Sequence, residues 1–391
     1  MKKQAQCMDY VQPSFYAELD GTIAGLRARG MDVIRLDIGS PDLPPSAEII
    51  ETLAQSARQP DHHGYQPING PQPLRDAWAK LYERLFDVEL DPDCEIVPLH
   101  GSKEGIFHFT LANTDADDVV LISEPAYPIY AQAARFVGAQ VELLPSNEES
   151  GFLPDFDVIP PEIAARARLL WLNYPNNPTG ATAPMAFFER AVAFAQEHGL
   201  LLCHDAAYCQ VTFDGYRVPS PLQLEGAKAV TVEFNSLSKS HNMAGWRMGV
   251  VVGDSDLVGS VRKLKPSLFS GQFKPMTDAA TAAINGDQSW LQDRNETYRL
   301  RRDLILMHLN ALGMEPAVPR AGLYIWMPVP DGWIAADFTA ALLENTGVSL
   351  TPGTVFGESG EGYARISLGA SRERIEEGMR RIAEWWRANI G

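Results

Sequence analysis

The sequence predicts an α/β protein whose larger part is a mostly parallel sheet of the seven-stranded type with helices on both faces. Two observations support this prediction. Short apolar runs of strand length recur between residues 45 and 274: DVVLI (118–122), LLWLNY (169–174), LLLCHD (200–205), AVTVEF (229–234) and MGVVVG (248–253). Helix-like segments separate them, such as PMAFFERAVAFAQEHG, which ends in Gly199 as a capped helix would. Apolar strands that alternate with helices form parallel sheets covered on both sides.

The sequence changes in character after about Gly286. Long polar helical segments precede two strand-like runs, GLYIWMPV and YARISLG, and a final helix. This pattern predicts a smaller α+β domain, which the N-terminal segment around VIRLDIGSPD joins. We expect an N-terminal arm with part of the small domain over residues 1–45, a large domain that holds the ligand site over 46–274, and a small C-terminal domain over 275–391.

Composition argues against several classes of function. The chain has 391 residues and a net charge of −17, which repels nucleic acid and anionic membrane surfaces. No run of about 18 apolar residues occurs, so we expect no segment to span a membrane. The sequence has neither a G-x-G-x-x-G fingerprint after its first strand nor a Walker-type phosphate loop. Their absence argues against a Rossmann dehydrogenase or a P-loop enzyme.

The N-terminal sequence and the cysteines predict a cytoplasmic location. The opening MKKQAQCMDYVQPSF has two lysines but lacks the apolar core of a secretory signal. The cysteines show neither metal-ligand spacing nor a disulfide framework, so we expect reduced thiols at Cys7, Cys94, Cys203 and Cys209.

Polar residues follow several predicted strands, at the edge where open α/β sheets bind ligands. In HGSKEGIFHF, Gly101 permits a tight turn and Ser102 opens a helix whose free N–H groups can bind an anion. In NYPNNPTGA, two prolines fix an extended turn that holds Asn177 at a strand end. The helix start is a weak signal alone, because most such turns serve only as caps.

Two further strands end in ionisable residues. CHDAAY places Asp205 and Tyr208 just beyond an apolar strand, and a buried carboxylate there needs a cationic or N–H partner. NSLSKSHNMAGWRMG follows AVTVEF directly and carries Lys239 and Arg247. Taken alone, Asp205 could cap a helix, Tyr208 could be a core aromatic, and the lysine segment could be a solvated loop.

One ligand would satisfy all four segments: a phosphorylated heteroaromatic aldehyde with a basic ring nitrogen, which is pyridoxal 5′-phosphate. NNPTG, HDAAY, SLSK and GWRMG also occur in the order and spacing of the fold-type I aminotransferases of class I/II. The sequence resembles that family over nearly its whole length, because DIGSPD, GYQPINGPQPLR, EPAYPIY and YARISLG match as well. Its motifs most closely resemble those of the LL-diaminopimelate aminotransferase branch.

The resemblance implies the catalytic roles. Lys239 condenses with the cofactor aldehyde, and its amine, once released, moves a proton as general acid and base. Asp205 keeps the pyridine nitrogen protonated, so that the ring accepts electrons from the substrate. Asn177 and Tyr208 hydrogen-bond the phenolic oxygen of the ring, and Tyr127 stacks on the ring.

The resemblance also implies the phosphate site. The phosphate would lie on the backbone N–H groups of Ser102 and Lys103, and Ser236, Ser238 and Arg247 would close around it. A planar guanidinium suits this position because it binds phosphate oxygens in a bidentate manner.

The substrate and the neighbouring subunit complete the implied site. Arg365 is the fork for the substrate α-carboxylate, with the backbone of Gly39 opposite and Asn177 beside it, although Arg365 could instead form a surface salt bridge. Lys103 is a cation in the first turn of a helix, where it opposes the macrodipole. Either the cofactor phosphate or a distal substrate carboxylate would explain a cation at this position. A lysine that points outward into solvent is the alternative. Tyr65 would reach the phosphate of the neighbouring subunit in a homodimer with shared active sites.

The implied activity is an exchange of an amino group between an amino acid and a 2-oxo acid such as 2-oxoglutarate, with LL-diaminopimelate as the best single donor. Two alternatives are an aminotransferase of alanine or aspartate type and a lyase that depends on the same cofactor and has the same fold. A regulator with an aminotransferase-like domain is a third hypothesis, but the chain shows no basic N-terminal extension for DNA binding. Two departures weaken the match: Ser14 stands where the branch has a tyrosine, with Tyr16 only nearby, and Ser270 stands where it has an asparagine.

Overall fold

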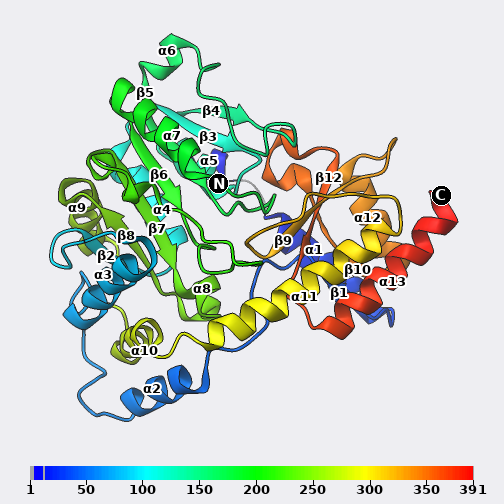
Figure 1. Ribbon diagram of the computed structural model, residues 1–391, viewed down its shortest axis with the longest axis horizontal. Helices are drawn as coiled ribbons and strands as arrows, with labels where there is room; N and C mark the ends of the chain where they lie inside the picture. Colours follow the sequence, from blue (N-terminus) through cyan, green and yellow to red (C-terminus); the bar gives the residue numbers. More distant parts are fainter. Residues whose placement is uncertain (1–3, 12–13, 391) are drawn as a thin grey trace.

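The computed structural model describes residues 4–11 and 14–390. Within these residues, seven strands form one sheet in the order β2-β8-β7-β6-β5-β3-β4 (Figure 1). Strands β3 to β7 run parallel, and β8 runs antiparallel to both of its neighbours. In chain order the strands are β2 (Ile96–Leu99), β3 (Val119–Glu124), β4 (Gln140–Pro145), β5 (Ala167–Asn173), β6 (Leu201–Asp205), β7 (Thr231–Ser236) and β8 (Gly249–Gly253).

Helices cover both faces of this sheet because successive strand residues point to opposite sides. Leu169 and Trp171 of β5 pack in one cluster with α4 (Ser102–Asn113), α5 (Ile129–Phe136) and α9 (Ser255–Leu264). Leu170 and Leu172 pack on the other face with α7 (Met185–His198). Near β2 and β8, that second face is covered by α3 (Gln72–Phe86) and α10 (Lys274–Asn285). The predicted fold class is confirmed.

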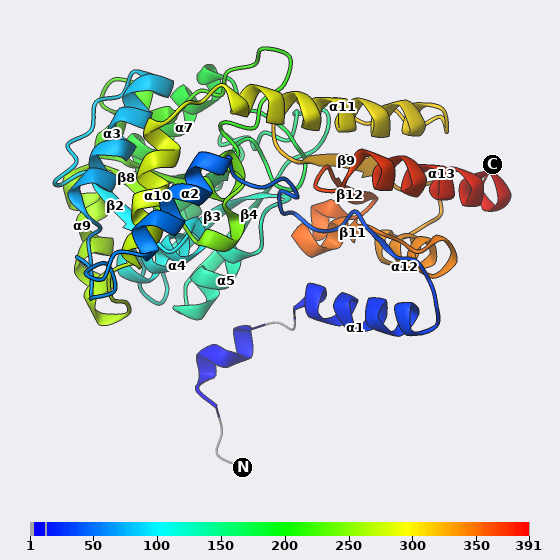
Figure 2. The ribbon, with the colours of Figure 1, turned by 90° about the horizontal axis from the view of Figure 1, so that it is seen from below.

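The remaining strands form a smaller unit beside the sheet (Figure 2). The runs GLYIWMPV and YARISLG contain β9 (Tyr324–Pro328) and β12 (Tyr363–Ser367), which pair antiparallel, and β11 (Thr351–Pro352) continues this sheet. β1 (Ile34–Arg35) pairs with β10 (Val348–Ser349), so the N-terminal segment joins this unit. Its α-helices are α1 (Phe15–Ala28), α11 (Trp290–Asn310), α12 (Ala335–Thr346) and α13 (Arg372–Asn389).

The expected domain boundaries remain a prediction, and the packing of two helices, α10 and α11, bears on them. α10 lies beyond residue 274 in sequence, but it packs against α3 and α2 (Ala47–Ala57) of the larger unit. α11 joins both units: Trp290 at its start packs with α3 and α10, whereas Ile305 and Leu309 near its end pack in the core of the smaller unit.

The shorter helices are α6 (Pro161–Ala164), α8 (Leu237–Ser240), η1 (Gln6–Tyr10), η2 (Pro221–Gln223), η3 (Ala227–Ala229), η4 (Ala244–Trp246), η5 (Lys265–Ser267), η6 (Gly353–Phe356) and η7 (Glu358–Gly360). Within residues 4–11 and 14–390, no helix is both long and apolar enough to cross a bilayer.

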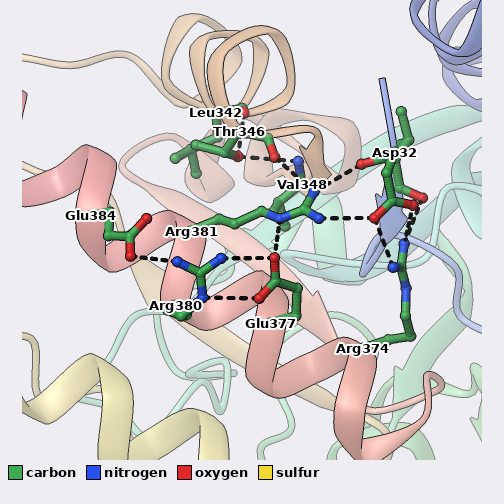
Figure 3. Close-up of polar contacts among 10 residues, drawn as sticks. Asp32, Leu342, Thr346, Val348, Arg374, Glu377, Arg380, Arg381 and Glu384 are labelled. Carbon is green, nitrogen blue, oxygen red and sulfur yellow. Dashed lines mark hydrogen bonds and ion pairs between the residues drawn. The ribbon is translucent and has the colours of Figure 1, made fainter. Parts of the chain in front are cut away.

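An ionic network ties the segment before β1 to the last helix (Figure 3). The Asp32 carboxylate accepts two hydrogen bonds of 2.8 Å from Arg374 and one of 2.8 Å from Arg381. Arg381 also donates to Glu377 and to the carbonyl of Thr346. These guanidinium groups, with Arg374 first, hold the pKa of Asp32 well below its usual range. The network joins α12, α13 and the N-terminal segment of the smaller unit.

Candidate active site

Three neighbouring parallel strands end in polar residues at one edge of the large sheet. In the strand register, Asn173 at the end of β5 lies beside Asp205 at the end of β6, and Ser236 ends β7. The Asn173 side chain donates to the carbonyl of Asp205 over 2.7 Å and accepts from the Asn177 N–H over 2.8 Å. The strand-to-loop turn is therefore fixed to the neighbouring strand at the place where open sheets bind ligands.

A cavity of about 270 Å³ lies at this edge, between the large sheet and residues from the smaller unit. Its lining comprises Tyr16, Gly39, Ser102, Lys103, Tyr127, Tyr130, Asn173, Asn177, Asp205, Ala207, Tyr208, Ser236, Ser238, Lys239, Ala244, Arg247, Tyr324 and Arg365. Every site residue named from the sequence lines this cavity except Tyr65. The side chain of Tyr65 lies outside it and is 94% exposed.

The amine of Lys239 reaches the smaller unit. Lys239 lies on the single turn α8, which Ser236 caps by accepting a hydrogen bond of 3.1 Å from the Ser238 N–H. Its Nζ donates to the carbonyl of Gly39. Burial, and after it the charges of Arg365 and Arg247, lower the pKa of Lys239 to about 8. The neutral, nucleophilic form of this amine is thus available close to neutral pH.

The Asp205 carboxylate is buried and held by two donors. Tyr130 donates to Oδ2 over 2.8 Å, and the Ala207 N–H donates to Oδ1 over 3.2 Å. Burial raises the pKa of Asp205 above its usual value, which these donors only partly offset. A cationic partner in the cavity would therefore stabilise the ionised form.

The Arg365 guanidinium joins segments that are far apart in sequence. It donates to Asn177 Oδ1 over 2.8 Å, to the Asp37 carbonyl over 2.7 Å and to the Tyr16 hydroxyl over 3.0 Å. The rings of Tyr324 and Phe356 lie 4.3 and 4.7 Å from its Cζ. Its Nε is buried and has no hydrogen-bond partner among the described residues. One donor of this fixed, planar fork thus has no protein partner in the described chain.

Tyr208 and Tyr324 form a buried pair next to the lysine. Their hydroxyl groups lie 2.8 Å apart, and the Tyr324 hydroxyl is 3.5 Å from the carbonyl of Gly39. Burial, and after it the neighbouring Tyr324, raises the pKa of Tyr208 well above its usual value. The Tyr208 phenol therefore stays protonated at neutral pH and can donate a hydrogen bond.

The turn between β2 and α4 forms an anion cradle. Gly101 has a φ of 87°, and a side chain there would collide with the guanidinium of Arg247. Arg247 is anchored by a hydrogen bond of 2.7 Å to the carbonyl of Ala244. Ser102 and Lys103, whose N–H groups are the first of α4, line the same cavity as Arg247. The Ser236 hydroxyl, by contrast, donates to the carbonyl of Met248 over 3.1 Å, so it already has a protein acceptor.

Lys103 lies on the cavity wall above Tyr127. Its Nζ is 5.6 Å from the centre of the Tyr127 ring. Burial, and after it the charge of Arg247, lowers the pKa of Lys103. An anion in the cavity would relieve the repulsion between these two cations.

Sequence reasoning missed four polar residues of the lining: Tyr16, Tyr130, Asn173 and Tyr324. Tyr130 and Asn173 lie inside the motifs EPAYPIY and NYPNNPTGA, so proximity to a strand end could have indicated them. Tyr324 lies in a run that reads as an ordinary buried strand. Tyr16 lies only near the position at which a tyrosine is expected, yet its hydroxyl contacts Arg365.

These residues fit pyridoxal 5′-phosphate. The cavity combines a helix start and a guanidinium for a phosphate, a buried carboxylate for a ring nitrogen, and an amine of lowered pKa for an aldehyde. Arg365 adds a separate guanidinium for a carboxylate of the substrate.

Comparison with known proteins gives the same class. The family model of the class I and II aminotransferases matches residues 31–382. The LL-diaminopimelate aminotransferase of Dehalococcoides mccartyi is 44% identical over 383 residues, which cover 98% of this chain and 99% of that one. Among solved structures, substrate-bound BacF from Bacillus subtilis has a TM-score of 0.95 at 33% identity, over 98% of both chains. A probable N-succinyldiaminopimelate aminotransferase from Thermus thermophilus has a TM-score of 0.89 at 36% identity, over 95% of this chain and 100% of that one.

The chain belongs to the class I and II aminotransferases. It is an aminotransferase of fold type I, and its cofactor is pyridoxal 5′-phosphate.

The lowered pKa of Lys239 can be measured in the cofactor-free protein. We expect competitive labelling with acetic anhydride, read by mass spectrometry of the Lys239 peptide, to show a midpoint at about pH 8. Arg365→Met should move this midpoint upward, because it removes a neighbouring cation. The exposed Lys263 provides the reference. A Lys239 midpoint near the ordinary 10.5 in the unmodified protein would contradict the proposed environment.

Proposed function

We propose that this aminotransferase transfers the amino group of LL-diaminopimelate to a 2-oxo acid such as 2-oxoglutarate. One observation supports the assignment of the reacting groups: Lys239, Asp205 and Arg365 line the same cavity of about 270 Å³. The names of the curated relatives, of which the first is 44% identical over nearly the whole chain, support the donor.

Asp205 would hold the proton on the ring nitrogen of the cofactor. Bound pyridoxal 5′-phosphate supplies an aldehyde that condenses with amines and a ring that accepts electrons from the substrate α-carbon. Tyr130 and Ala207 orient the Asp205 carboxylate, and burial makes a positive N–H group a favourable third donor. Asn177 and Tyr208 would donate to the phenolic oxygen, and Tyr127 would lie against the ring.

Lys239 would be the nucleophile for the aldehyde and then the base at the substrate α-carbon. A pKa of about 8 places a substantial fraction of neutral amine at physiological pH. The short helix turn and the contact with Gly39 hold Nζ in the cavity.

Arg365 would bind the α-carboxylate of the substrate. Asn177 fixes one terminal nitrogen of the guanidinium, whereas Tyr16 and the Asp37 carbonyl fix the other. The unpartnered Nε and the backbone of Gly39 complete the proposed carboxylate site.

The phosphate would lie at the start of α4. The N–H groups of Ser102 and Lys103 are proposed to bind it together with Arg247, Ser236 and Ser238. Ser236 would contribute mainly by capping α8, since its hydroxyl hydrogen is engaged by Met248.

We expect purified holoenzyme to form glutamate from LL-diaminopimelate and 2-oxoglutarate, with a kcat/KM at least about tenfold above those for alanine and aspartate. Tenfold corresponds to about 1.4 kcal/mol of transition-state stabilisation, a modest demand on one additional charged contact. Lys239→Ala should abolish glutamate formation. Equal turnover with alanine or aspartate would remove diaminopimelate as the donor, and near-normal turnover in Lys239→Ala would remove the assigned base.

Lys103 provides a separate test of the donor. If its ammonium binds the distal carboxylate, Lys103→Ala should raise KM for diaminopimelate by about tenfold and leave KM for alanine nearly unchanged. Lys263→Ala, at an exposed position in α9, is the matched control. Equal increases in both KM values would assign Lys103 to the cofactor phosphate.

Tyr65 would complete the active site of a partner subunit. It projects from the segment between α2 and α3 and is 94% exposed, although its own chain contains the rest of the proposed site. We therefore propose a homodimer. We also propose a cytoplasmic location, which the four unpaired cysteines support and which cell fractionation can test.

Mixed dimers test the crossing of Tyr65. Chains with Lys239→Ala and chains with Tyr65→Ala should each be nearly inactive alone. Random mixing should restore about a quarter of wild-type activity, because half of the dimers would be mixed and each would hold one complete site. Refolding the two variants separately and then combining them without subunit exchange is the control. If Tyr65 served its own chain, mixing would restore nothing.

A further inference from the structure

The segment from Lys265 to Gln272 clasps the turn that precedes α4. It connects α9 with α10 and begins with η5. Lys265 Nζ donates to the carbonyl of Pro98, and Gln272 Nε2 donates to the next carbonyl, of Leu99, over 3.0 Å. Two consecutive carbonyls at the end of β2 therefore accept side-chain donors from one segment 167 and 173 residues away in sequence.

Gln272 also connects this turn to Arg247. Its Nε2 lies 3.1 Å from the carbonyl of Arg247, and Gln272 is 7% exposed. Arg247 in turn lies 3.5 Å through Nη2 from the carbonyl of His100. One buried amide thus links the strand that leads to Ser102 with the residue that supplies the guanidinium of the cradle.

Lys265 is a buried cation outside the proposed chemistry. It is 1% exposed, and burial lowers its pKa to about 8. The negative charge of Glu104 raises this pKa and so offsets part of the effect of burial. Burying an ammonium is costly unless it forms compensating contacts. Its compensating contacts are the carbonyl of Pro98 and the nearby charge of Glu104, which lies in the first turn of α4.

Glu104 is held against the same segment by aromatic packing. Its carboxylate accepts from the His100 N–H over 2.9 Å and lies 3.2 and 3.4 Å from the imidazoles of His100 and His108. The Phe269 ring packs on both imidazoles, with centroid distances of 5.1 and 5.3 Å. The first turn of α4 is therefore fixed from outside the cavity by Lys265 and Phe269.

We propose that Lys265 and Gln272 are positioning residues for the cofactor phosphate. They do not line the cavity. They act through the backbone by fixing the β2–α4 turn and Arg247 relative to each other, so that the N–H groups at the start of α4 and the guanidinium converge on one anion. This inference rests on the proposed placement of the phosphate at the start of α4.

Comparing two ligands isolates the phosphate contribution. The cofactor-free full-length protein is titrated with pyridoxal 5′-phosphate and with pyridoxal, which lacks the phosphate, and the dissociation constants are measured by absorbance. We expect Gln272→Leu to weaken binding of pyridoxal 5′-phosphate by about tenfold and binding of pyridoxal by less than about twofold, because only one ligand uses the cradle. Lys265→Met should show the same selective loss. Lys263→Met, in the last turn of the adjoining α9, should change neither constant.

Gln272→Leu decides the test even if Lys265→Met fails to fold, because it leaves buried Lys265 and its contacts with Glu104 and Pro98 in place. A parallel loss of affinity for both ligands would overturn the inference, since a general structural defect has that effect, and so would unchanged affinities for both. If the unmodified protein bound the two ligands equally well, the placement of the phosphate would itself be wrong. Selective loss in Gln272→Leu, with discrimination retained in the unmodified protein, supports the inference.

Discussion

The buried guanidinium of Arg365 is the constraint on which the cavity depends. A charged side chain that is only 2% exposed needs hydrogen-bond acceptors within the protein. Arg365 donates to the side chain of Asn177 in the larger unit, to the carbonyl of Asp37 and to the hydroxyl of Tyr16 in α1. Its position on β12 is fixed by pairing with β9, which also carries Tyr324. One side chain therefore joins both units and the N-terminal helix, and the cavity forms where they meet.

The charges in the cavity bear on the ligands that it favours and on the pKa of its lysine. Among the described residues, Lys103, Lys239, Arg247 and Arg365 line it, against one carboxylate, that of Asp205. An excess of positive charge in a partly buried space favours a phosphate and a carboxylate as ligands. Burial is the main cause of the lowered pKa of Lys239, and the positive charges of Arg365 and Arg247 lower that pKa further. The same cations thus favour an anionic ligand and add to the effect of burial on the lysine.

Support for the cavity comes from its lining and from residues outside it. Asn173 holds the end of β5 to the end of β6, and Gln272 holds the end of β2 to Arg247. On the smaller unit, Asp32 and its arginine partners fix the segment that continues into β1 (Figure 3). These contacts satisfy backbone groups or charges of the elements that carry the motifs, and most of the residues that make them belong to no recognisable motif themselves.

The fold class and the order of the reacting groups follow from the amino-acid sequence alone. Apolar runs separated by helical segments specify a covered parallel sheet, and the spacing of Asn177, Asp205, Lys239 and Arg247 is a property of the chain. Parallel strands bring their carboxyl ends to one edge, so the order of strands and motifs is enough to place these residues near each other.

Which other residues contact these motif residues, by contrast, depends on tertiary packing. Tyr16 reaches Arg365 across 349 residues of sequence, α10 packs on the larger unit, and Tyr65 is exposed and does not line the cavity of its own chain. Local periodicity shows which face of an element is buried but not against which partner it packs. Contacts between distant segments follow from how the two units dock, and this docking depends on the packing of the whole core.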